Sequence, residues 1–467
     1  MFRPRSLEPL SPRITMLSAS PWPRKRLILS LGLFVSFYFI GLRRGLSVVQ
    51  FPNEWEYWAS RNEEATDLPC ASLEGLDDVF VILKTGANEA SEKLPVHLRT
   101  TLDCIPHYGI WSDLEGDISG HHVSNALDEV DPQVIASHQD FEYYRRLQEQ
   151  GRDAFSADEQ AKWANAQNTA SGRDTPGWKL DKWKFLPLAD KAYHQRPEAK
   201  WFIFMECDTF IIWKNMLAWL STMDASKPLY LGQQMRIGDV VFAYGGSGIV
   251  ISNPAMKALV EHRAANLKFY DDFTGQHWAG DCVLGKAMLD AGVELTWSWP
   301  TLLGDVVSEL DFNSTFANDA VHPWCYYATS YHHLTPPEVS QYDEFERKWR
   351  KENAGTLLRH GDIFRYFVLP KIRSEIADWD NLSADTQNSE TGTLADCRSV
   401  CENQSGCVQF SLTGRTCRTS KAIKLGHEHQ QQDPASERVS SGWIMERVAA
   451  FVDEMNASCQ GEDWVLP

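Results

Sequence analysis

At 467 residues, the chain is too long for one hydrophobic core, and its length predicts two or three folded units. Hydrophobic residues make up 43% and aromatic residues 12%, which excludes a disordered chain, a collagen-like chain and a membrane protein with several spans. The formal net charge is −18, although residues 1–50 hold eight Lys/Arg and a single acidic residue. A body this acidic argues against nucleic acid as a partner, because such binding depends mainly on neutralising phosphates.

The N-terminal region contains one apolar segment. Residues 27–42 are an uncharged run of sixteen, with basic residues directly before and after it. The run predicts a transmembrane signal-anchor, short against the usual ~20 residues and therefore suited to a thin early-secretory membrane. The basic bias of residues 1–26 predicts a cytosolic tail and a lumenal body. A cleaved signal peptide is the alternative.

The cysteine content agrees with a lumenal location. Most of the ten cysteines are expected to pair in an oxidising compartment. Four of them lie close together: Cys397, Cys401, Cys407 and Cys417. Their growing spacings favour disulfides over zinc, whose ligand pairs usually lie two to four residues apart. Four sequons fit a glycosylated chain: Asn313, Asn381, Asn403 and Asn456.

The middle of the chain alternates buried strands with helices. This pattern predicts an α/β domain over residues 76–377, with a mainly parallel sheet covered on both faces. Strands are expected at 79–83, 201–205, 229–233 and 240–244, and helices from Asn253-Pro254 and from Asp281. A stem precedes this domain at 43–75. A polar linker follows it at 378–395, and a small disulfide-rich α+β domain is expected at 396–460.

An acidic pair follows the strand at 201–205. Glu206 and Asp208 are two residues apart, so their side chains can share a face at the carboxyl end of a central strand. Open α/β sheets bind ligands at this end, and paired carboxylates suit Mg²⁺ or Mn²⁺ shared with a diphosphate. The alternative is that Asp208 or Thr209 caps the next helix.

Three further features carry candidate site residues. Gly245 and Gly246 either let a ligand approach the backbone or form a plain tight turn. Asp281 is either a general base for an acceptor hydroxyl or a helix N-cap. His332 is either a Mn²⁺ ligand beside carboxylates or a satisfied, partly buried residue.

Taken in order, these segments resemble glycosyltransferase family 31, which includes Fringe and the core-1 β-1,3-galactosyltransferase, and in particular its fungal branch. The resemblance covers roughly residues 76–340 and is carried by WFIFMECDTFIIWKNMLAWL, YLGQQMRIGDVVFAYGGSGIVIS, WAGDCVLGKAMLDAGVEL and SYHHL. It implies a GT-A fold, a nucleotide-sugar-binding sandwich with a metal at the carboxyl edge of its sheet. It also implies a single-pass type II protein of the Golgi membrane with a lumenal catalytic domain.

The resemblance assigns roles to individual residues. Asp281 matches the catalytic base, and the metal, Mn²⁺ or Mg²⁺, is held by Asp208, His332 and Glu206. Cys207 departs from the family's triple-aspartate form, so the middle position offers no carboxylate. Five residues are implied on the donor side: Thr85, Asp113, Lys184, Gly245 and Gly246.

The family implies a metal-dependent, inverting transfer of a hexose or N-acetylhexosamine from a UDP-sugar to a glycan or glycoprotein acceptor, forming a β-1,3 linkage. Trp278 is a candidate on the acceptor side, because aromatic faces pack on pyranose rings. The C-terminal unit resembles a PAN/Apple module, which binds protein or carbohydrate. The alternatives are a catalytically inactive, lectin-like Golgi protein and a glycoside hydrolase, which uses two carboxylates without metal or nucleotide.

Overall fold

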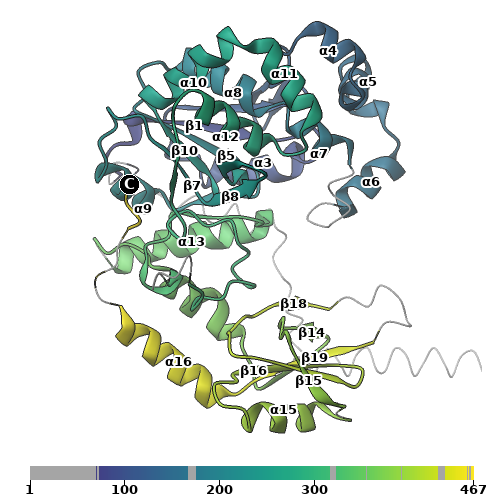
Figure 1. The fold of residues 1–467 in the computed structure, drawn as a ribbon, viewed down its shortest axis with the longest axis vertical. Helices are drawn as coiled ribbons and strands as arrows, with labels where there is room; N and C mark the ends of the chain where they lie inside the picture. Colours follow the sequence, from purple (N-terminus) through teal and green to yellow (C-terminus); the bar gives the residue numbers. More distant parts are fainter. Residues whose placement is uncertain are drawn as a thin grey trace, which may run out of the picture. The chain divides into compact units, whose positions relative to one another are not determined.

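The computed structural model describes residues 70, 73–166, 175–315, 322–353, 355–390, 392–429, 437–459, 461 and 464–467 (Figure 1). They belong to a unit that covers residues 68–467. The predicted cytosolic tail, the signal-anchor at 27–42 and nearly all of the stem lie outside the described residues. Within the part that is described, no helix combines the length and apolar character needed to cross a membrane.

An eight-stranded sheet forms the centre, in the order β11-β7-β10-β5-β1-β2-β4-β3. Its strands are β1 (Val79–Lys84), β2 (Tyr108–Ser112), β3 (Gly116–Ile118), β4 (His121–Asn125), β5 (Trp201–Glu206), β7 (Tyr230–Gly232), β10 (Ile249–Ser252) and β11 (Leu295–Trp297). The α/β class is as predicted, and the sheet is mixed, with four parallel and three antiparallel strand pairs. β10 runs antiparallel to both β5 and β7, and β3 runs antiparallel to β4.

The direction of β10 follows from a short connection. Between β7 and β10 the chain forms only a hairpin, β8 (Gln234–Ile237) with β9 (Val240–Ala243), and the turn at Gly245–Ser247. A parallel strand needs a crossover of about a dozen residues or more, usually through a helix. The predicted strand at 240–244 therefore belongs to this hairpin and not to the central sheet.

Side chains of the central strands alternate between two cores. On one face, Val81 and Ile203 pack with α3 (Ala90–Arg99) and α9 (Trp213–Ser221). On the other, Ile82 and Phe202 pack with a layer of three helices: α8 (Phe185–Gln195), α10 (Asn253–Ala265) and α12 (Gly280–Asp290). Figure 1 shows these three helices side by side over the sheet. Burial on both faces explains why β1 and β5 are apolar up to their last residues, Lys84 and Glu206.

The two expected helix starts shift, by one residue in α10 and by two in α12. The N-cap of α10 is Ser252, and Pro254 lies in its first turn. The N-cap of α12 is Ala279, so Asp281 lies inside the first turn and is not the cap. The remaining elements of this part are α4 (Pro132–Ser137), α5 (Glu142–Gln150), α6 (Ala157–Ala166), α7 (Pro176–Asp181), α11 (Leu267–Gln276), α13 (Pro336–Glu352), α14 (His360–Ile363), β6 (Phe210–Ile211) and β12 (Ser330–Tyr331).

A second sheet follows, in the antiparallel order β13-β19-β16-β17-β15. Its strands are β13 (Glu375–Ala377), β15 (Asp385–Glu390), β16 (Gln409–Thr413), β17 (Thr416–Ser420) and β19 (Val439–Trp443). The helices of this region are α15 (Leu394–Glu402) and α16 (Met445–Ser458). Separately, β14 (Trp379–Asp380) pairs with β18 (His427–Glu428). Residues 378–395, predicted as a linker, instead supply β14, β15 and the start of α15. A polar sequence suits β15, because an edge strand is protected by polar side chains.

Eight cysteines are paired, as expected for an oxidising compartment: Cys70–Cys104, Cys325–Cys459, Cys397–Cys417 and Cys401–Cys407. The four clustered cysteines thus form disulfides, as predicted, and are not zinc ligands. Cys207 and Cys282 are free and buried. One expectation fails: the sequon residue Asn381 is fully buried, with its amide bonded to Phe410 O and Gly442 O, so this fold cannot carry a glycan there.

Candidate active site

The acidic pair lies at the carboxyl end of β5. Glu206 is the last residue of the strand, and Asp208 follows it in a turn. Neither Asp208 nor Thr209 caps α9, whose N-cap is Ile212. Instead, Asp208 Oδ1 lies 3.1 Å from His332 Nε2, and Glu206 Oε2 lies 3.7 Å from the same nitrogen.

Strand pairing explains how His332 reaches this site. β12 pairs antiparallel with β6, with Tyr331 opposite Phe210, so the residue after β12 faces the turn before β6. The Leu334 N–H also donates to the Asp208 carbonyl at 3.0 Å. The other ring nitrogen of His332 lies 3.3 Å from the Tyr244 hydroxyl, which holds the imidazole in place.

The Gly245–Gly246 turn lies between Asp281 and the cluster formed by Glu206, Asp208 and His332. A Cβ on Gly246 would come within 2.2 Å of the His332 ring, and one on Gly245 within 3.0 Å of Glu206 Oε1. The Gly245 N–H donates to Asp281 Oδ2 at 3.1 Å. The turn therefore contacts both this cluster and Asp281. The close approach to His332 and Glu206 is possible because glycine has no side chain.

Asp281 has the character of a base. It lies in the first turn of α12, and its other oxygen accepts from the Cys282 N–H at 2.8 Å. Burial raises its pKa to about 6, against the two backbone hydrogen bonds, which lower it. A carboxylate with a pKa near neutrality accepts a proton more readily than an exposed one.

Two further lysines lie at the site, and neither was predicted from the sequence as a site residue. Lys84 Nζ lies 3.1 Å from Glu206 and 2.5 Å from Asp181, and Lys93 Nζ lies 3.4 Å from Asp208. Lys84 is the last residue of β1 and is directly opposite Glu206 in the parallel register. The sequence does show that Lys84 ends one buried strand and Glu206 ends another. This indicates an ion pair only if the two strands are known to be neighbours.

These partners set the charges of the cluster. Burial alone raises the pKa of Glu206, but Lys84 and His332 outweigh it and lower the pKa to about 2. Likewise, His332 and Lys93 hold the pKa of Asp208 well below its usual range despite burial. Burial lowers the pKa of His332, yet Asp208 and Glu206 raise it to about 9, so the imidazole is protonated at neutral pH in the absence of a cation.

The three other donor-side candidates lie together at the ends of β1 and β2. Lys184 Nζ donates to the Thr85 carbonyl at 2.8 Å and lies 3.9 Å from Asp113 Oδ2. The Ala87 N–H donates to Asp113 Oδ1. Asp181 connects this group to the cluster, because it pairs with both Lys184 and Lys84.

The donor set of the cluster suits a divalent cation. Asp208, His332 and His333 each offer one ligand atom, and these atoms all lie within 4.8 Å of one another. One carboxylate oxygen with two imidazole nitrogens matches the ligands that Mn²⁺ accepts. The buried Nδ1 of His333 has no hydrogen-bond partner among the described residues, as expected of an atom reserved for a ligand.

A mixed α/β sandwich with carboxylates and an imidazole at the carboxyl edge of its central sheet has the general architecture of a GT-A fold. Residues 75–299 match the family model described as Fringe-like. This part of the chain, which includes the acidic pair, the double glycine and Asp281, is thus Fringe-like. A Fringe-like domain indicates a glycosyltransferase.

Proposed function

We propose that the protein is a metal-dependent, inverting glycosyltransferase that moves a hexose or N-acetylhexosamine from a UDP-sugar to a glycan or glycoprotein, forming a β-1,3 linkage. One observation carries the proposal. The Gly245–Gly246 turn contacts Asp281 on one side and the Glu206 and His332 side chains on the other. A base and a cation-binding cluster thus border one site, as a single displacement requires.

Asp281 acts on the acceptor. The acceptor oxygen bonds to the anomeric carbon as its proton passes to the Asp281 carboxylate, while the bond from that carbon to the diphosphate breaks and UDP leaves. Attack opposite the leaving group inverts the anomeric centre. General-base assistance of this kind typically contributes ~10²–10⁴-fold to the rate.

The cluster acts on the donor. Asp208, His332 and Glu206 would hold the cation, which when bound neutralises charge on the leaving diphosphate. His332 must lose its proton to become a ligand, because only the neutral imidazole coordinates a metal. The buried lysines keep Glu206 and Asp208 ionised, so both carboxylates are ready for a cation.

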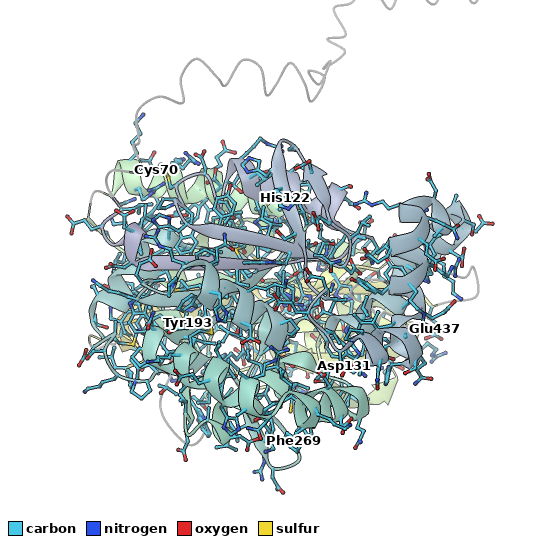
Figure 2. The ribbon with its side chains drawn as sticks, turned by 90° about the horizontal axis from the view of Figure 1, so that it is seen from above. Cys70, His122, Asp131, Tyr193, Phe269 and Glu437 are labelled. Atoms are coloured by element: carbon cyan, nitrogen blue, oxygen red, sulfur yellow. A yellow bond between two sulfur atoms is a disulfide. The ribbon has the colours of Figure 1, made fainter. Side chains whose placement is uncertain are left out.

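A row of aromatic side chains supports an acceptor side next to Asp281. Four successive ring pairs, with interplanar angles of 10–21°, link Trp178, Trp278, His277, Phe273 and Phe269. Trp278 is 49% exposed and lies three residues before Asp281. Phe269, labelled at the edge of the molecule in Figure 2, ends the row on α11. Such side chains suit the C–H faces of pyranose rings.

The proposal includes the cellular setting. The run at 27–42 would anchor the protein in the Golgi membrane with this domain in the lumen, and the paired cysteines agree with that compartment. The C-terminal unit would bind protein or carbohydrate in the manner of a PAN/Apple module.

The test is a screen of UDP-sugars with Mn²⁺ and a panel of glycan acceptors. We expect one donor to give a β-linked product by NMR, and EDTA to abolish transfer. Calorimetry that detects no binding of UDP, with or without Mn²⁺, would favour the lectin-like alternative. Hydrolysis of glycans that needs neither nucleotide nor metal would favour a glycoside hydrolase.

A further inference from the structure

His333, directly after the candidate metal ligand His332, is in an unusual conformation. Its φ is +60°, one of four positive values among the described non-glycine residues. Positive φ is uncommon for residues other than glycine, and histidine is one of the few residue types that adopts it readily. The conformation turns two consecutive imidazoles to the same side, with ring centroids 3.8 Å apart.

The side chain of His333 also has an unmet polar group. Its Nδ1 is buried and makes no hydrogen bond within the described part of the chain. A buried nitrogen without a partner costs free energy, of the order of 1–3 kcal/mol. A ligand bound to this nitrogen would supply the missing partner.

The acidic side of the cluster offers few ligands. Cys207, at the middle position of the triplet, provides no carboxylate, and its carbonyl is bonded to His97 Nε2 at 2.8 Å. Glu206 Oε1 is engaged by Lys84. The group of ligand atoms that lie close enough to share one ion consists of Asp208, His332 and His333.

We propose that His333 is a metal ligand, which completes a site of two imidazoles and one carboxylate with His332 and Asp208. The second imidazole takes the place of Glu206, whose Oε1 pairs with Lys84. This inference rests on the proposed metal-dependent function and specifies its ligands. A site rich in nitrogen favours Mn²⁺ or Co²⁺ over Mg²⁺, which prefers an all-oxygen shell.

Binding of Mn²⁺ to the full chain, measured by EPR, tests the proposal without an activity assay. Pulsed EPR counts the imidazole nitrogens coupled to the bound ion, and we expect two in the natural protein. His333→Asn should leave one nitrogen and weaken Mn²⁺ binding by at least ~10-fold, in line with losses at metal sites. Asparagine tolerates positive φ, so this variant retains the fold. His122→Asn, at an exposed position of β4 (Figure 2), is the matched control and should bind as the natural protein does.

Three results would overturn the proposal. One coupled nitrogen in the natural protein, with unchanged affinity in His333→Asn, removes His333 from the site but leaves metal-dependent transfer intact. Absence of any bound Mn²⁺ in the natural protein removes this proposal and the metal dependence of the proposed function together. Mg²⁺ that binds as tightly as Mn²⁺ would also contradict a nitrogen-rich site.

Discussion

Burial gives Asp281 a proton affinity that an exposed aspartate lacks. Its pKa of about 6 reflects desolvation first, and Glu206 adds to the rise. The hydrogen bonds from Gly245 and Cys282 stabilise the ionised form only in part. A buried, ionised Asp281 carboxylate lowers the stability of the fold. Destabilising features of this kind are typical of functional sites.

Asp281→Asn should separate catalysis from binding. We expect transfer to fall by about 10²–10⁴-fold, because asparagine cannot accept the acceptor proton. UDP and Mn²⁺ binding by calorimetry should be unchanged. Since the variant removes a buried charge, its melting temperature should exceed that of the natural protein at pH 8, and the gain should shrink toward pH 4, where Asp281 is itself protonated. Asp272→Asn, on exposed α11, is the control; equal losses of binding and transfer would mark Asp281 as structural.

The pH dependence of kcat/KM should have an acid limb from Asp281. The base works when ionised, so activity is retained above its pKa and falls about tenfold per pH unit below it. The inflection should lie at or below pH 6, because a nearby bound cation lowers this pKa further. Profiles at several Mn²⁺ concentrations check the assignment. A limb that moves with Mn²⁺ belongs instead to proton competition at His332, whose pKa is raised to about 9 without metal.

Single residues differ in how well the sequence discloses them. The positions of Asp208 after β5 and of Asp281 in the first turn of α12 were predictable, because each follows from a local pattern of strand or helix start. Lys84 was not, since its function depends on lying opposite Glu206 in the register of β1 and β5. The buried sequon at Asn381 shows the same limit: three letters of sequence carry no information on burial.

At the scale of elements, two short connections assemble the site. The turn between β9 and β10 brings the glycines against His332, and the two-residue pairing of β12 with β6 brings His332 to Asp208. The sequence predicts the turn from its glycines. It does not predict the β12–β6 pair, which joins segments more than 110 residues apart through only two residues each, too few for a periodic pattern.

Gly246→Ala should damage the metal site selectively. The added Cβ would lie 2.2 Å from the His332 ring, so the imidazole must move away from Asp208. We expect Mn²⁺ affinity to fall by at least ~10-fold, as for other groups that orient metal ligands. Gly245→Ala should cost less, since its nearest neighbour is a carboxylate oxygen at 3.0 Å.

Gly116→Ala is the control for this pair of variants, because a Cβ there meets nothing within 4 Å. Titration of Mn²⁺ by EPR, with the melting temperature of each variant measured alongside, separates a local effect from unfolding. Equal affinities in Gly246→Ala and Gly116→Ala would show that His332 is not held against the turn.

At the scale of the whole molecule, the C-terminal unit is joined to the rest by a common core. Trp324 and Phe364 pack against Phe451 of α16, in a cluster that also contains Trp443 of β19. The polar linker predicted at 378–395 therefore does not mark a break in packing. A sequence can reveal where composition changes, but the partners of each apolar face depend on how the elements fold back, so the shared core was not predictable.

The disulfide Cys325–Cys459 fixes this arrangement covalently. It closes a loop of 134 residues, whereas Cys401–Cys407 closes one of six. Loop-closure entropy grows with length, so Cys325→Ala/Cys459→Ala should lower the free energy of unfolding by about 2–5 kcal/mol, more than Cys401→Ala/Cys407→Ala does. Urea titrations of both double variants measure the difference. Mn²⁺ affinity of the folded protein should stay unchanged, because β6 and Tyr244 still hold His332. Equal losses of stability would mean that the shared core, and not the covalent link, holds α16 in place.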